Sequence, residues 1–309
     1  MKYSSIRVIE DVKGNYSVHD TNAGFRMVLE RQWNNEHLTL LKSRGITMLT
    51  IFRSNQPSLD FLKLLPELTS LTVSGYDTCD ASEISGLVEL QDLQFHCKSK
   101  PTLDLTRLVN LESLRFWSDS MPIGLEYLRN LQFLYLERTQ LSDLQRFENC
   151  SKLTQIRLDG GALSSFKGIQ SLEKLSVVEF SHLRKLNDLS ELTGNESIHK
   201  LRISACKKIP SVAVYATMPN LVSLQFWNCG VLDTLKPLEG NQSLVDVFIT
   251  DNTRVADGDL GPIARIPTLK HFWVQDQRSF SHRNKDLPKM DNDERLALID
   301  RLCGGPFDF

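Results

Sequence analysis

Residues 131–136, Leu-Gln-Phe-Leu-Tyr-Leu, contain the pattern that decides the fold, with apolar residues at the first, fourth and sixth positions. The same L-x-x-L-x-L spacing occurs eleven times, and every one of its positions is apolar. The eleven units begin at Ile46, Leu68, Leu90, Leu111, Leu131, Leu153, Leu172, Ile198, Leu221, Leu244 and Leu269. Consecutive units start 19 to 26 residues apart. A period near 22 residues is typical of a solenoid built from short repeats.

Each unit predicts one strand followed by one turn. The fourth and sixth positions alternate with polar neighbours, as in a strand that is buried on one face. Apolar series spaced by three residues follow, such as Leu141, Leu144 and Phe147, and this spacing fits a single 3-10 turn. Other such series are Leu163, Phe166, Ile169 and Leu232, Leu235, Leu238. Because one unit cannot bury its own leucines, we expect an α/β right-handed solenoid (a horseshoe). It would have a concave parallel sheet of about eleven strands, short 3-10 or irregular convex segments, and a cap at each end.

These residues resemble the leucine-rich repeat superfamily, in particular the short-repeat internalins and the cytosolic phosphatase-regulatory subunits. The resemblance covers about residues 46–277, and convex stretches such as Leu141-Ser-Asp-Leu144 carry it. The superfamily usually places Asn or Cys three residues after the last strand leucine. Three late units follow this rule, with Cys206, Cys229 and Asn252. Earlier units depart from it and make their turns harder to predict, with Tyr76, Lys98, Asp119, Gly161 and Phe180.

The chain is expected to divide into an N-terminal cap (1–45), the repeats (46–277), and a linker with a C-terminal capping helix (278–309). In the first cap, Ser5 to Val18 predicts a hairpin that turns at Gly14-Asn15, and a helix begins after Asn34 and stops at Gly45. The polar stretch Ser279 to Lys289 is expected to be a loose linker. The last helix would begin at Asn292, place Leu296, Ile299 and Cys303 on one face, and end before Gly304.

Aromatic residues are concentrated where the concave face is expected. Side chains alternate along a strand, so residues two, four and six places after the first apolar residue point away from the core. Three of the four tryptophans occupy such positions, and four further aromatic residues join them: Trp117, Trp227, Trp273, Phe52, Phe133, Tyr135 and Phe248. Water-facing rings of this size are typical of interface anchors. The alternative is that strands favour aromatic residues and that neighbouring rings cover one another.

Charges of both signs lie among these rings. Basic residues are central, with Arg115, Arg157, Lys174, Lys200 and Arg202, while Glu137, Asp159, Asp92 and Asp246 are interspersed. A basic stripe with aromatic residues can indicate nucleic-acid binding. The carboxylates and the formal net charge of −2 disfavour that reading. The predicted partner-binding residues are Arg115, Trp117, Phe133, Tyr135, Glu137, Arg157 and Asp159 at the centre, then Arg202, and a second patch of Trp227, Phe248 and Trp273.

Enzymatic chemistry finds little support in the sequence. Glu137 and Asp159 are expected in the same column of adjacent strands, about 4.8 Å apart along the sheet, and two such carboxylates could form a glycosidase pair. The presence of these two carboxylates is better explained by ion pairs with Arg115, Arg138 and Arg157. The histidines are expected to be solvated surface residues, Gly160-Gly161 a turn, and Cys303 an apolar contact. We therefore expect no catalytic residues, no metal site and no cofactor.

The expected compartment is the cytoplasm. The first ten residues lack the apolar region of a secretory signal, and no apolar run reaches the roughly 18 residues of a membrane span. The six cysteines form no C-x-x-C pair and no tight cluster, which disfavours a zinc site or a disulfide framework.

The function that the sequence favours is non-enzymatic binding of a protein partner on the concave face, as an inhibitor or immunity protein. A cytosolic adaptor or a phosphatase-type regulatory subunit is the alternative, and an enzyme centred on Glu137 and Asp159 is less favoured. The choice of inhibitor follows from the resemblance, because a fold alone does not fix a function. The sequence leaves the oligomeric state and the identity of the partner open.

The first prediction concerns the cysteines. Because no two share a metal-ligand spacing, titration with a thiol reagent in denaturant should find all six as reduced thiols, without bound metal. A tightly bound zinc ion, or fewer than six thiols in protein kept under reducing conditions, would contradict this expectation.

Overall fold

The computed structural model describes residues 7–53, 56–118, 120–209 and 211–303. Its contacts group the chain into two compact units. Unit 1 comprises residues 1–138 and 149–152, and unit 2 comprises residues 139–148 and 153–309. The hairpin residues Ser5 and Ile6, the turn residue Asp119 and the helix terminator Gly304 lie outside the described residues.

Unit 1 has eight strands whose order in space follows the chain. They are β1 (Arg7–Val12), β2 (Tyr16–Thr21), β3 (Gly24–Leu29), β4 (Met48–Phe52), β5 (Ser70–Cys79), β6 (Asp92–Ser99), β7 (Ser113–Trp117) and β8 (Phe133–Thr139). The first three are antiparallel, and each pair from β3 to β8 is parallel. The helix α1 (Asn35–Arg44) joins β3 to β4, and short turns follow later strands: η2 (Asp60–Leu64), η3 (Ser82–Gly86) and η4 (Leu125–Tyr127).

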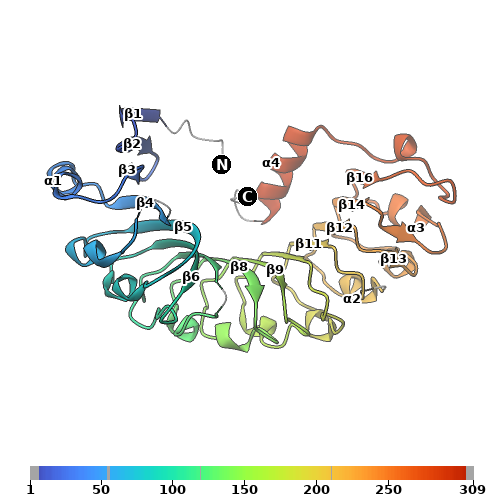
Figure 1. The fold of residues 1–309 in the computed structure, drawn as a ribbon. Coiled ribbons are helices and arrows are strands. Elements are labelled where there is room, and N and C mark those ends of the chain that lie inside the picture. The colour runs from blue at the N-terminus through green and yellow to red at the C-terminus, as the bar shows by residue number, and fades with distance from the viewer. Residues whose placement is uncertain (1–6, 54–55, 119, 210, 304–309) are drawn as a thin grey trace. The chain divides into compact units, whose positions relative to one another are not determined.

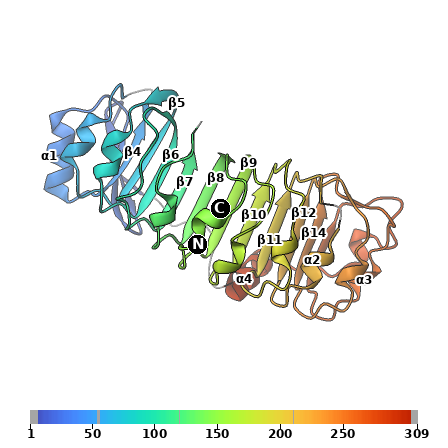
Figure 2. The same ribbon diagram turned by 90° about the horizontal axis from the view of Figure 1, so that it is seen from below.

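Unit 2 continues the alternation of strand and turn (Figures 1 and 2). Its parallel strands are β9 (Gln155–Gly161), β10 (Val177–Ser181), β11 (Lys200–Ser204), β12 (Ser223–Trp227), β14 (Asp246–Thr250) and β16 (His271–Val274). Its turns are η5 (Gln145–Phe147), η6 (Ile169–Ser171), η7 (Ser190–Leu192), α2 (Ala213–Ala216), η8 (Lys236–Leu238), α3 (Gly261–Ala264) and η9 (Asn284–Asp286). Two short strands, β13 (Val231–Leu232) and β15 (Arg254–Val255), pair with each other, and α4 (Asn292–Cys303) ends the described chain.

The prediction of a leucine-rich repeat solenoid is confirmed. All eleven expected parallel strands are present, and the expected turn series coincide with η5, η6 and η8. Leucines such as Leu134, Leu144 and Leu238 are buried between the sheet and the turns of the same unit. Each repeat thus covers the apolar residues of its neighbours, which is how a solenoid makes a continuous core.

The predicted register of the seventh repeat is wrong by three residues. β10 pairs so that Val178 lies opposite Ile156 and Phe180 opposite Leu158, and the buried triplet is Leu175, Val178 and Phe180. The repeat intervals of 19 and 26 residues thereby become 22 and 23. The error arose because Leu172, Leu175 and Val177 have the same spacing, although Leu172 belongs to the turn before the strand. Lys174 is therefore not a sheet residue.

From β8 to β14, the end of each parallel strand or the turn after it contains a residue in the left-handed conformation. Two residues past the last buried strand position, φ lies between 50° and 70° in six consecutive repeats: Arg138, Gly160, His182, Ala205, Asn228 and Asp251. Of these, only Gly160 adopts it without steric cost. The amide of His182 donates to Ser204 O at 3.0 Å, and that of Ala205 donates to Trp227 O at 2.7 Å. The turns are thus tied to the next strand. The two glycines predicted to form a turn, Gly160 and Gly161, are instead the last residues of β9, where both have a positive φ.

The predicted N-terminal hairpin and helix are present. β1 and β2 pair around Gly14, whose φ is 68°, and α1 begins after the cap residue Asn34 and ends at Gly45. The third strand, β3, was not predicted. His37 was expected to be solvated, but it is buried. Its ring accepts a hydrogen bond from the Asn34 amide and lies 3.1 Å from Asn15 Oδ1. Burial lowers the pKa of His37.

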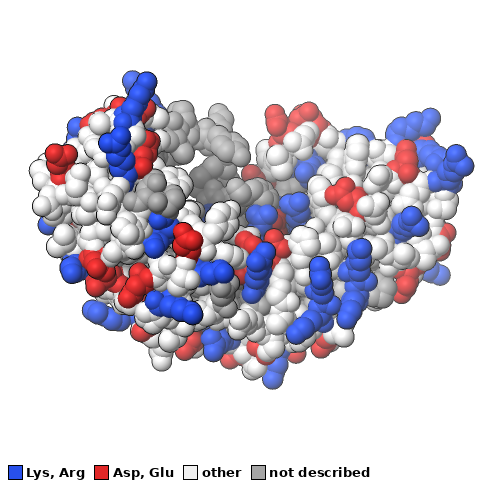
Figure 3. Space-filling view, in the orientation of Figure 1, with Lys and Arg blue, Asp and Glu red and all other residues white. Residues whose placement is uncertain are grey.

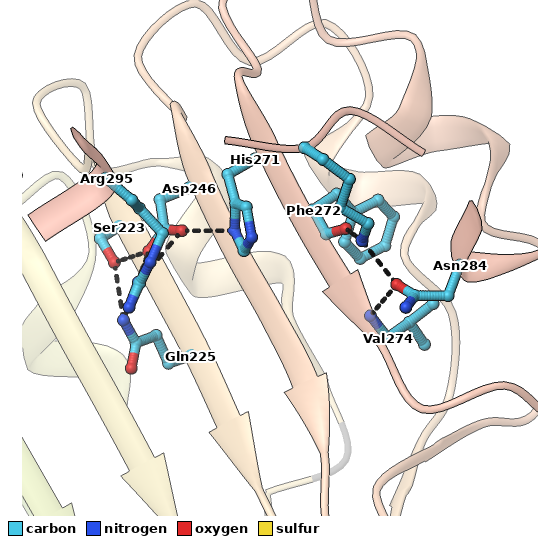
Figure 4. A network of polar contacts seen from close by, with 9 residues as sticks. Ser223, Gln225, Asp246, His271, Phe272, Val274, Asn284 and Arg295 are labelled. Atoms are coloured by element: carbon cyan, nitrogen blue, oxygen red, sulfur yellow. Dashed lines mark hydrogen bonds and ion pairs between the residues drawn. The ribbon is translucent and has the colours of Figure 1, made fainter. Parts of the chain in front are cut away.

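The stretch expected to be a loose linker covers the edge of the last strand. Phe272 N donates to Pro288 O at 2.9 Å, and Val274 N donates to the side chain of Asn284 at 3.2 Å (right side of Figure 4). Lys289 Nζ donates to Phe272 O and lies 4.8 Å from the Trp273 ring centroid. An exposed strand edge is a template for unwanted pairing, so a polar segment that satisfies its amides protects it.

The last helix was expected to cap the end of the repeats, and instead packs across the face of the sheet opposite the turns, which we call the open face (Figure 1). Ile299 and Cys303 are buried against Val177 and Val222, near the starts of β10 and β12. Leu296, expected on the same buried face of the helix, is 38% exposed. The first open-face residue of each strand from β10 onward is consequently buried: Val177, Lys200, Ser223, Asp246 and His271.

The register of the seventh repeat can be tested by mutation. Phe180→Ala should lower the free energy of unfolding by about 3–5 kcal/mol, because it removes a fully buried ring from the core. The register predicted from the sequence would place Lys174 in the sheet. Lys174→Ala should change the free energy of unfolding by less than about 0.5 kcal/mol. Urea unfolding measures both. Equal midpoints for the two variants would refute this register.

Candidate functional site

The open face of unit 1 forms a cavity of about 640 Å³, which we call the Tyr76 cavity. Its floor is the last open-face residue of five consecutive strands: Phe52, Ser74, His96, Trp117 and Glu137. Gly75, Tyr76, Asp77 and Arg138 complete its lining. Two predicted binding residues, Trp117 and Glu137, therefore lie in one site, and Tyr76 and Asp77 are lining residues that sequence reasoning did not identify.

The wall of the cavity is a bulge in β5, between its two segments of pairing with β6. The pairing of β5 with β6 is interrupted between Ser74 and Thr78, and it resumes with Thr78 opposite Lys98 and Cys79 opposite Ser99. The interrupting residues bulge from the sheet, and Tyr76 is 88% exposed. Glycine is required at 75 because a Cβ there would collide with the side chain of Arg53. The departure of this unit from the superfamily turn pattern was the one sequence signal for this bulge.

The cavity combines ring faces with carboxylates. Arg138 Nε lies 3.8 Å from Glu137 Oε1, and its guanidinium carbon lies 5.9 Å from the Trp117 ring centroid. Burial lowers the pKa of His96 and outweighs the opposing effect of Glu137, so the imidazole is neutral at pH 7. The buried Nε2 of His96 has no hydrogen-bond partner among the described residues. The cavity thus holds an unused polar atom beside aromatic surface.

The remaining predicted residues of unit 1 lie beside this cavity. Arg115 is half-buried, with its guanidinium 3.5 Å from Asp92 Oδ1 and 4.4 Å from the Phe133 ring centroid. Tyr135 is half-buried in the next strand, opposite Arg115. The structure therefore brings together Arg115, Trp117, Phe133, Tyr135 and Glu137 on β7 and β8 of one sheet.

Arg157 and Asp159, predicted to share that patch, belong to unit 2 and pair there with residues of the next strand and turn. Arg157 Nε lies 3.6 Å from Glu179 Oε2, and Asp159 Oδ1 lies 2.8 Å from His182 Nδ1. The buried Glu179 also lies 3.5 Å from Lys200 Nζ, and burial lowers the pKa of that lysine. Glu179 was missed because the misplaced register put it outside the open face.

The two carboxylates considered as a catalytic pair fall in different units. Glu137 has Arg138 beside it in unit 1, and Asp159 has His182 in unit 2. Glu137 is therefore explained by an ion pair and Asp159 by a hydrogen bond, each within its own unit.

Cations of the chain itself cover two of the three rings in the second predicted patch. Trp227 and Phe248 stack with ring centroids 6.2 Å apart, while Arg202 lies 4.6 Å from the Trp227 centroid and Arg295 lies 4.5 Å from that of Phe248. Trp273 is 42% exposed despite its contact with Lys289. The alternative that neighbouring side chains cover these rings thus accounts for Trp227 and Phe248, while Trp273 keeps a free face.

A polar network lies under α4, where sequence reasoning expected solvent-facing residues (Figure 4). The buried carboxylate of Asp246 accepts from Ser223 Oγ at 2.6 Å and from Gln225 Nε2 at 3.3 Å. It also lies 3.0 Å from His271 Nδ1 and 3.4 Å from Arg295 Nη1. Burial alone would raise the pKa of Asp246, but the hydrogen bond to His271 and the charge of Arg295 outweigh it, so the pKa is lowered. His271 is therefore a structural residue and not the solvated one expected.

Charges of both signs are intermixed on the visible side of each unit (Figure 3). Within the described ranges, no group of three or more His, Cys, Asp or Glu side chains could hold a metal ion. All six cysteines are buried as free thiols. The helices in the part of the chain that the structure describes are too short or too polar to cross a membrane.

No protein-family profile and no curated protein matches the chain. Among solved structures it is similar to internalin C2 of Listeria monocytogenes, with 27% identity and a TM-score of 0.42, over 48% of this chain and 66% of that one. A leucine-rich repeat protein of Leptospira interrogans matches with 14% identity and a TM-score of 0.38, over 90% of this chain and 93% of that one. A plant peptide hormone receptor in complex with the peptide RGF2 matches with 16% identity and a TM-score of 0.44, over 85% and 52%. The match thus covers about half to nine tenths of the length of these three proteins. Its leucine-rich repeat fold is established by its own strands and turns.

The Asp246 network should make stability depend on pH. Because the pKa of Asp246 is lowered in the folded state, its carboxylate stabilises the fold above about pH 4. That contribution is lost as the pH falls through the lowered folded value. Asp246→Asn should therefore lower the free energy of unfolding at pH 7 by about 3 kcal/mol, and the difference from wild type should shrink below about pH 4.

Urea unfolding between pH 7 and pH 3 measures this difference. Asp233→Asn, at an exposed position of the same unit, is the matched control and should follow wild type throughout. A deficit for Asp246→Asn that stays constant down to pH 3 would show that the lost contribution is packing and not charge.

Proposed function

We propose that this protein binds a protein partner through the open face of its sheet and acts as an inhibitor or immunity protein without enzymatic activity of its own. The observation that carries the proposal is the Tyr76 cavity, where large rings face water. Tyr76 is 88% exposed and Phe52 is 43% exposed, and exposed rings grouped in one place are typical of interaction sites.

The leucine-rich repeat fold suggests a protein-binding role, and the dimensions support a protein partner. The five strands β4 to β8 span about 19 Å at the usual strand spacing of about 4.8 Å. Large rings and arginines of this face, such as Trp117, Tyr135 and Arg115, are the residue types that dominate binding energy in protein interfaces. Trp273 offers a further exposed ring on unit 2.

The choice of an inhibitor over an adaptor or a phosphatase-type regulatory subunit follows from the resemblance described above. An adaptor would use the same surface and leave its partner active. The proposed compartment is the cytoplasm, where the buried thiols would remain reduced.

The proposal is tested by affinity purification from the native cell, followed by measurement of the partner's affinity and activity. Trp117→Ala and Tyr76→Ala should each weaken binding by about 30-fold, the cost of losing an interface anchor of about 2 kcal/mol. Because Tyr76 contacts mainly solvent, Tyr76→Ala should change the free energy of unfolding by less than about 0.5 kcal/mol. Isothermal titration calorimetry and urea unfolding provide the two readouts.

Tyr127→Ala is the matched control, because Tyr127 is an exposed ring on the turn side of unit 1. Its affinity should equal that of wild type. Unchanged affinity in both cavity variants would remove the partner from this surface. A partner that keeps its full activity in the complex would favour the adaptor over the inhibitor.

A further inference from the structure

We propose that the Tyr76 cavity receives an arginine side chain of the protein partner. This inference rests on the proposed function, and it specifies the chemistry that the cavity recognises. It follows from the rings, the carboxylates and one unsatisfied nitrogen that line the cavity.

The first step is that the aromatic rings of this sheet are repeatedly covered by guanidinium groups. Arg115 lies over Phe133, Arg202 over Trp227 and Arg295 over Phe248, at 4.4 to 4.6 Å from the ring centroids. A planar guanidinium stacks on an aromatic face and is attracted by its negative charge density. Among the described residues, no cation lies over Tyr76 or Phe52. The cavity therefore contains ring faces of the kind that the chain covers elsewhere with its own arginines.

The second step is charge. Asp77 and Glu137 are the acidic residues of the lining, and Arg138 is its one basic residue. Arg138 is a weak occupant, because its side chain is 72% exposed and its nitrogen lies 3.8 Å from Glu137. Ion pairs this exposed contribute little to stability, because water and salt screen them. The nearby charge of Arg115 is already paired with Asp92. An entering guanidinium can therefore displace Arg138 from Glu137 at little cost.

The third step is a hydrogen-bond acceptor. The buried Nε2 of His96 has no partner in the described part of the chain, and the ring is neutral because burial lowers its pKa. In the tautomer that carries its proton on Nδ1, the neutral imidazole offers Nε2 as an acceptor. Arginine carries five donors and no acceptor, so it can bond His96 and a carboxylate at the same time. Lysine lacks the planar group that stacks between rings.

Capped tripeptides test the cavity without the partner. Gly-Arg-Gly should shift the indole N–H signal of Trp117 in a two-dimensional NMR spectrum at concentrations up to about 10 mM, where contacts with a Kd near 1 mM saturate. Trp117→Phe assigns that signal among the four tryptophans. The same peptide with citrulline, which keeps the shape and loses the charge, should bind about tenfold more weakly. Gly-Lys-Gly should also bind more weakly than the arginine peptide.

The double variant Asp77→Asn, Glu137→Gln should reduce binding of the arginine peptide to the level of citrulline. Glu89→Gln, an exposed acid on the turn side of unit 1, is the matched control and should bind like wild type. Equal binding of the arginine and citrulline peptides, equal binding of lysine, or shifts confined to other tryptophans would each overturn the inference. If the cavity variants weaken partner binding while the arginine peptide does not bind, the proposed function stands and this inference fails.

Discussion

Mutual burial of the repeated leucines is the constraint on which the rest of the structure depends. Each strand contributes two or three apolar side chains to a core that only the neighbouring repeats can close, so the spacing of about 22 residues has to recur along the chain. The late repeats are slightly longer, and two of them have α2 and α3 in place of a 3-10 turn. Because the core needs only the inward-facing positions, the outward positions of the same strands are free to carry binding chemistry.

The two ends of the repeat array are closed by polar contacts as much as by apolar ones. At the start, Asn34 and His37 satisfy the first amides of α1, and at the end Asn284 and the Pro288 carbonyl satisfy the amides of β16. A buried or edge amide without a partner costs free energy comparable to a lost hydrogen bond. The terminal segments therefore close the array through hydrogen bonds. From its composition alone, the C-terminal segment was predicted to be only a polar linker.

The open face has different characters in the two units. In unit 1 the last open-face column is accessible and joins the bulge of β5 to make a cavity. In unit 2 the first open-face column lies under α4, held by Ile299, Cys303 and the ion pair of Arg295 with Asp246. The same alternation of strand side chains thus yields a candidate binding surface in one unit and a buried polar network in the other. The difference is set by whether a later segment of the chain packs on the face.

The sequence by itself determined the repeat, the eleven parallel strands, the 3-10 turns, and the outward orientation of residues such as Trp117 and Glu137, because strand periodicity and leucine spacing are local properties. It determined the N-terminal hairpin and α1 through their turn and cap residues. Only the tertiary structure decided the register of β10, since two overlapping triplets have the same spacing and pairing with β9 and β11 selects one. Only the tertiary structure placed α4 over Asp246 and raised Tyr76 on the β5 bulge, because both depend on which distant residues supply contacts. A periodic pattern records which side chains point outward, and it carries no information about what then covers them.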